Sequence, residues 1–125
     1  MSAEADRLDH EAQQLENEAR QLDETAGYVR NKGRELLSVA VDLHRPFRDS
    51  VGSSWQGPQA ERFLHHNEAR LNRMRNNEGT LQTVARRMEE AARRARDEAR
   101  QKRERASQLR REEEERRRNE AAHRR

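Results

Sequence analysis

A long helical repeat runs through residues 8–47, which read LDHEAQQLENEARQLDETAGYVRNKGRELLSVAVDLHRPF. Apolar or small residues recur in this stretch at alternating spacings of four and three over more than five heptads. One recurring position is Leu or Val, and the other is Ala or Gly until Phe47. Such spacing is typical of the contact seam of a coiled coil. It predicts a helix over about 3–45, with Ser2 as a suitable N-cap.

A second segment with the same periodicity follows a short connection. Residues 46–57 are rich in Pro, Gly and Ser, which favour a loop, and Pro58 suits the first position of a new helix. We expect helix 2 over about 58–106 and a charged Arg/Glu tail over 107–125 that is either helical or frayed. Because the connection is short, the helices should run antiparallel, which makes the chain an all-α two-helix hairpin of residues 1–106. The predicted seam consists of Leu8, Leu15, Leu22, Val29, Leu36, Leu43, Leu64, Leu71, Met74, Leu81 and Met88.

Volume and charge both favour one register of the two helices, in which the numbers of facing residues add up to about 107. Large residues then face small ones, for example Met74 against Gly33, and such alternation suits close packing. The same register places residues 1–29, with two basic and eight acidic side chains, beside the basic residues 84–106. Exposed ion pairs contribute only about 0–1 kcal/mol each, but together they select a register.

Two helices alone form a thin core, so the hairpin is expected to need a partner. Leu37, Val41 and Phe63 form a second apolar stripe outside the seam. We expect this stripe to pack against a second hairpin, either another copy or a paralogue, and so to complete a four-helix bundle.

Composition excludes several classes of protein. Charged residues make up 41% and hydrophobic residues only 30%, and both figures disfavour a β-sandwich or a doubly wound α/β enzyme. No run of about 20 apolar residues is present, so no membrane span is expected. The chain has no Cys, no Gly-rich phosphate loop and no catalytic triad pattern, so we expect no enzymatic activity and no cofactor. His44, His65 and His66 are interpreted as solvated side chains, with a metal site as the alternative.

The loop carries a more specific signal. Trp55 and Gly57, followed by Ala60 and Phe63, resemble the Trp-x-Gly motif of the WXG-hundred family, the small leaderless substrates of type VII (ESX) secretion in actinobacteria and firmicutes. The resemblance covers about residues 5–100. It implies a dimeric helical hairpin that a membrane ATPase machine exports, with a cytoplasmic stage before export. The family's Tyr-x-x-x-Asp/Glu signal does not follow helix 2, because the only Tyr is Tyr28, so a paired partner would have to provide it.

Two questions stay open at the level of the sequence. Trp55 either anchors the loop on the hairpin end or also contacts a partner or a secretion component. The basic segment 86–111 suggests an alternative function, an intracellular coiled-coil module that binds nucleic acid. Acidic residues interrupt this segment and no aromatic residues accompany it, so nucleic-acid binding is the weaker hypothesis.

Overall fold

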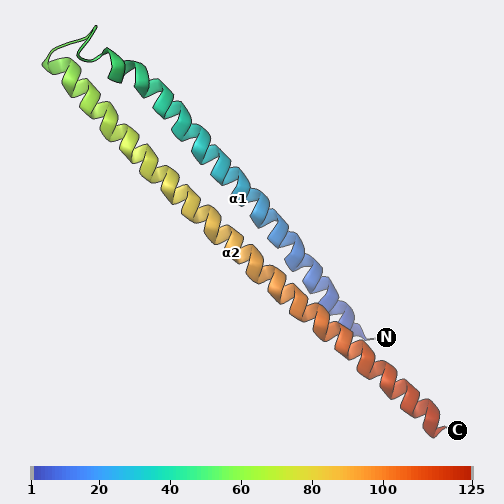
Figure 1. The fold of residues 1–125 in the computed structure, drawn as a ribbon. Coiled ribbons are helices and arrows are strands. Elements are labelled where there is room, and N and C mark those ends of the chain that lie inside the picture. Colours follow the sequence, from blue (N-terminus) through green and yellow to red (C-terminus); the bar gives the residue numbers. More distant parts are fainter. Residues whose placement is uncertain (1, 125) are drawn as a thin grey trace. The chain divides into compact units, whose positions relative to one another are not determined.

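The computed structural model describes residues 2–124 and is all-helical, as predicted (Figure 1). Helix α1 spans Ala3–Ser50 and helix α2 spans Pro58–His123, and the two helices pack against each other. The residues between them contain one isolated β-bridge, between Val51 and Trp55, and no strand is present among the described residues. Ser2 caps α1 as predicted, since its Oγ accepts a 3.1 Å hydrogen bond from the Ala5 N–H.

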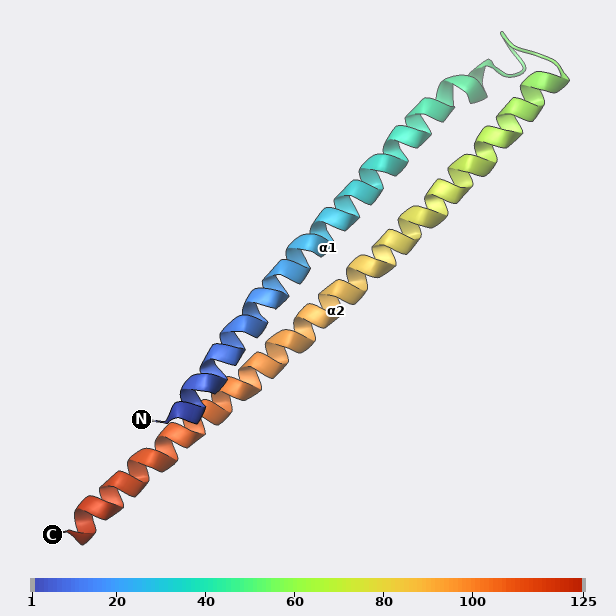
Figure 2. The same ribbon diagram turned by 180° about the vertical axis from the view of Figure 1, so that it is seen from behind.

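The chain divides into two compact units, each built from segments of both helices. We call Met1–Glu24 with Met88–Arg125 the alanine unit, and Thr25–Arg87 the loop unit. Within each unit the segments of α1 and α2 lie side by side and run antiparallel, as the views from both sides show (Figure 1, Figure 2).

The core of the alanine unit consists of alanine. Six alanines spaced by seven residues are at most 1% exposed: Ala5, Ala12, Ala19, Ala92, Ala99 and Ala106. The seam residues Leu8, Leu15, Leu22 and Met88 are only half-buried. A methyl side chain lets two helix backbones approach closely, but each layer then removes little apolar area from water. Hydrophobic burial within this unit is therefore modest.

Gly33 marks a close contact in the loop unit. A Cβ built at Gly33 would lie 3.2 Å from Leu81 Cδ1 and 3.7 Å from Glu78 Cγ. Nearby, Gln82 Nε2 donates a 3.4 Å hydrogen bond to the Arg30 carbonyl oxygen. The predicted register, which placed Met74 opposite Gly33, is therefore wrong here by four to seven residues along α2. A shift of one turn exchanges the two recurring seam positions of α2, which brings small residues of α1, such as Ala26, toward small residues of α2, such as Ala85, and both alanines are buried.

Helix α1 is longer than the sequence predicts, and the charged tail after residue 106 is helical. Helix α1 continues through Pro46 to Ser50, where Ser50 Oγ donates a 2.7 Å hydrogen bond to the Pro46 carbonyl and the Val51 N–H donates to Phe47. Pro46 lies in the second-to-last turn, so its missing N–H disrupts the helix at only one point. Helix α2 continues to His123 without a change at residue 106.

Two exposed ion pairs accompany the C-terminal part of α2. Arg117 NH2 lies 3.1 Å from Glu113 Oε1, and Arg118 NH2 lies 2.9 Å from Glu114 Oε1. Both pairs have the favourable order, with the acid four residues before the base. Their spacing indicates why this highly charged segment remains helical.

The exposed face of the loop unit is not the face that the sequence predicts. Leu36 and Leu43, which the pattern assigns to the seam, are 60% and 65% exposed. Leu37 and Val41, which it assigns to the outer stripe, are half-buried, as are Val29, Leu64 and Leu81, whereas Leu71 is buried. The physical reason is the close contact at Gly33, because it turns the glycine and alanine edge of α1 toward α2. The leucines on the neighbouring positions are left in solvent.

Candidate interaction surface

Exposed apolar side chains gather in the loop unit. Nine large apolar residues are exposed among the described residues, and all nine belong to this unit: Tyr28, Leu36, Val39, Leu43, Phe47, Trp55, Phe63, Met74 and Val84. The spacings from Leu36 to Leu43 and Phe47 are seven and four residues, so these three side chains share one face of α1. A contiguous apolar surface of this kind commonly marks a site of protein interaction.

A groove of about 290 Å³ lies in this surface. Its walls are largely apolar and come from both helices: Leu36, Val39, Ala40, Leu43, His44 and Phe47 from α1, and Asn67, Arg70, Leu71 and Met74 from α2. Leu71 is the only buried lining residue and forms the floor, Ala40, His44 and Asn67 are half-buried, and the remaining lining residues are exposed at the rims.

The loop end of the unit is closed by three aromatic rings. Phe63 contacts Phe47 edge to face at a centroid distance of 5.3 Å, and it contacts Trp55 at 5.2 Å. Trp55 is nevertheless 39% exposed. The indole thus anchors the loop, which agrees with the first sequence interpretation, and also presents part of its surface to solvent.

The loop backbone fixes Trp55 in place. The Trp55 N–H donates a 2.9 Å hydrogen bond to the Ser50 carbonyl, and the Trp55 carbonyl accepts a 2.8 Å bond from the Gly52 N–H. Gly57 has a φ of 110°, which side chains with a Cβ rarely adopt. Gly57 therefore serves the backbone geometry of the loop, as the sequence suggests, and Ala60 is fully buried at the start of α2.

Few polar side chains line the groove or lie near it. Arg70 lines it and makes no ion pair or hydrogen bond within residues 2–124. His44 Nδ1 is buried without a hydrogen-bond partner. His65 Nδ1 lies 4.0 Å from Glu68 Oε2, and no group of three or more potential metal ligands occurs in the described part of the chain. The surface is thus suited to binding by shape and apolar contact, with Arg70 as its charged element.

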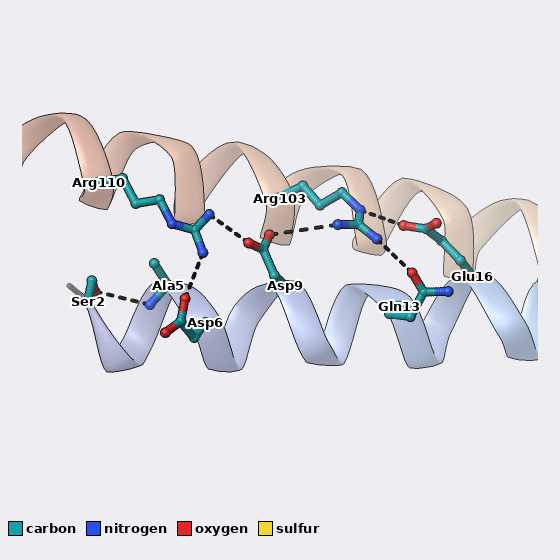
Figure 3. A network of polar contacts seen from close by, with 8 residues as sticks. All are labelled: Ser2, Ala5, Asp6, Asp9, Gln13, Glu16, Arg103 and Arg110. Carbon is teal, nitrogen blue, oxygen red and sulfur yellow. Dashed lines mark hydrogen bonds and ion pairs between the residues drawn. The ribbon is translucent and has the colours of Figure 1, made fainter.

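The acidic and basic segments face each other in the alanine unit, as the charge pattern predicts (Figure 3). Arg103 Nε lies 2.6 Å from Glu16 Oε1, and its NH1 lies 3.8 Å from Asp9. Arg110 NH1 lies 2.6 Å from Asp9 Oδ2, and its NH2 lies 2.9 Å from Asp6 Oδ1. The hydrogen bond to Glu16 raises the pKa of Arg103, and the bonds to Asp9 and Asp6 raise that of Arg110.

Two further pairs complete this ion-pair ladder. Arg96 bonds Asp23, so the basic members Arg96, Arg103 and Arg110 recur every seven residues. Lys102 Nζ lies 2.9 Å from Glu11 Oε2, and its hydrogen bond lowers the pKa of Glu11. The ladder joins the two helices within the alanine unit and has a consistent heptad spacing.

Sequence reasoning found part of the candidate surface. It found Trp55 and Phe63, which the structure brings together, but it missed Val39 and Arg70. The spacing of Leu36, Val39, Leu43 and Phe47 is the signal that identifies an apolar stripe, whereas nothing in the sequence marks Arg70.

Neither described helix contains an apolar stretch of the length that a bilayer crossing requires. Comparison with protein-family models, curated proteins and solved structures finds no match.

Proposed function

We propose that this chain is a non-enzymatic interaction protein, a WXG-like helical hairpin that pairs with another hairpin through the exposed apolar face of the loop unit. A type VII secretion system carries it as a substrate or as a co-exported partner. The observation that supports pairing is the groove lined by Leu36, Leu43 and Met74, which remains open in the single chain. A second pair of helices laid on this face would form a four-helix bundle.

The loop supports the secretion part of the proposal. Trp55 packs against Phe63 and its N–H bonds the Ser50 carbonyl, yet the residue is partly exposed. Large, rigid aromatic rings of this kind often dominate the binding energy of an interface. In this proposal the paired hairpin provides the Tyr-x-x-x-Asp/Glu export signal of the family.

The experiment is an export assay in an actinobacterial host with an active type VII system. The tagged chain should appear in the culture filtrate of this host and remain in the cells when the secretion ATPase is inactivated. Leu43→Asp should reduce export because it places a charge in the groove, whereas Asp42→Asn is a matched control on a neighbouring exposed position. Export that does not depend on the ATPase would contradict the proposal.

The nucleic-acid alternative has less support. Arg96, Arg103 and Arg110 lie in the basic segment on which it rests, and each bonds carboxylates of α1. Their charge is thereby partly neutralised within the protein, which reduces the number of phosphate contacts that the segment offers.

A further inference from the structure

We propose that the chain covering the groove of the loop unit is not a second copy of this protein but a different, acidic hairpin that places a carboxylate against Arg70. This inference rests on the proposed pairing function and specifies the chemistry of the partner.

The lining of the groove carries one permanent charge, which is positive. Arg70 is its only permanently charged lining residue, and the remaining lining is apolar except for His44 and Asn67. Residues 25–87 as a whole carry 11 Lys and Arg against six Asp and Glu. The loop unit therefore has a net positive charge, which favours an acidic partner.

Arg70 is exposed at the rim of the groove, so a chain that covers the groove contacts Arg70 and withdraws part of its guanidinium from water. Loss of hydration without a counter-charge is unfavourable, so a carboxylate at this point of the covering surface stabilises the complex. Arg70 makes no ion pair within the described residues, whereas Lys32 of the same unit is already bound to Glu35 at 3.1 Å. The unmet electrostatic requirement is thus located at Arg70.

A second copy of the chain meets this requirement poorly. Its own groove would bring another Arg70 and no carboxylate. Most of its acidic N-terminal segment is used internally, because five of the eight carboxylates there are ion-paired with α2: Asp6, Asp9, Glu11, Glu16 and Asp23. Like charges brought together at an interface reject that partner.

The experiment uses two designed amphipathic helical peptides of about four heptads. Both have the same Leu stripe, and they differ only in Glu or Lys at the positions flanking the stripe. Binding of each labelled peptide to the full chain is measured by fluorescence anisotropy at low and at physiological salt. We expect the Glu peptide to bind at least tenfold more tightly than the Lys peptide, with a preference that decreases as salt increases.

Two variants localise the effect. Arg70→Glu should abolish or reverse the preference for the Glu peptide. Arg75→Glu is the matched control, because Arg75 lies on the same helix but outside the groove, where it bonds Asn72, and it should keep most of the preference. Equal effects of both variants, or equal binding of both peptides, would overturn the inference.

The oligomeric state separates this inference from the proposed function. Sedimentation equilibrium should show no homodimer at micromolar concentration, and a homodimer that Leu43→Asp dissociates would overturn the acidic-partner inference while leaving pairing through this face intact. If Leu43→Asp has no effect on the binding of either peptide or on self-association, the face is not an interaction surface, and the proposed function fails together with the inference.

Discussion

At the scale of single residues, two glycines with different backbone conformations show how local geometry determines the effect of a side chain. Gly57 has a φ of 110° in the loop, whereas Gly79 is an ordinary helical residue of α2. A Cβ at either position would meet no atom within 4 Å. The backbone conformation alone therefore distinguishes them.

Two single variants, Gly57→Ala and Gly79→Ala, test the effect of the backbone conformation. Gly57→Ala should destabilise the chain by about 1–3 kcal/mol, because it forces a side chain into a sparsely populated conformation. Gly79→Ala should stabilise it by up to about 1 kcal/mol, because alanine has the higher helix propensity. Urea unfolding followed by circular dichroism measures both changes, and opposite signs are the expected result.

Trp55 is the second test at this scale. Because its ring contacts Phe63 but remains partly exposed, Trp55→Ala should cost about 1–3 kcal/mol, less than the 3–5 kcal/mol typical of a fully buried aromatic residue. The helical content should stay nearly unchanged, and a thermal melt with circular dichroism measures both quantities. A loss of most of the helix signal at 25 °C would show that the indole is essential for folding. Trp55→Phe, which keeps a ring at this position, is the control.

At the scale of helices, the ion-pair ladder supplements a seam of small residues. Alanine layers bury little apolar area, and an all-alanine contact gives similar packing in several registers one heptad apart. The pairs Arg103–Glu16 and Arg110–Asp9 add contacts with defined partners. Such pairs contribute more to the choice of register than to the total stability.

A charge swap tests the pairing of Arg103 with Glu16. Arg103→Glu and Glu16→Arg should each destabilise the alanine unit, and the double variant should recover part of the loss, because the pair is restored with opposite polarity. Arg93→Glu is the control, because Arg93 is exposed and shows no ion pair with Glu16. A double-mutant cycle by thermal melting measures the coupling, which should decrease in high salt. Additive effects of the two changes would contradict this pairing.

Low pH should lower the stability of the alanine unit. Because the bond from Lys102 lowers the pKa of Glu11, the folded state binds the Glu11 proton less readily than the unfolded state does. This contribution to stability is present above the ordinary pKa of about 4.5 and is lost as the pH falls through the lower folded value. Melting temperatures measured between pH 7 and pH 3 should therefore decrease, and the decrease should be smaller in Glu11→Gln.

At the scale of the whole molecule, the two units differ in what they leave exposed. Among the described residues the alanine unit presents no large apolar side chain as exposed, and its acidic segment is paired with its basic one. The loop unit exposes nine large apolar side chains. Exposed apolar surface of this extent commonly marks a site of protein interaction, and here it is confined to one unit.

Substitutions of two leucines in the loop unit should distinguish effects on folding from effects on association. Leu43 is 65% exposed, so Leu43→Asp should change the free energy of unfolding of the isolated chain by less than about 0.5 kcal/mol. Leu71 is buried, so Leu71→Asp should unfold at least the loop unit. Urea unfolding measures stability, and binding of helical peptides measures association. If Leu43→Asp unfolds the chain, Leu43 is part of the core.

The sequence by itself determined the helical class, the antiparallel pairing, the loop and the opposition of acidic and basic segments, because periodicity, turn residues and charge are local or additive properties. The tertiary structure alone decided which heptad position is buried. Leucine is the more hydrophobic residue, so the pattern assigned Leu36 and Leu43 to the seam, but the close contact of Gly33 with Leu81 places the small residues between the helices and the leucines outside. That choice depends on how closely two backbones can approach, which is a property of the pair of helices and not of either sequence segment alone.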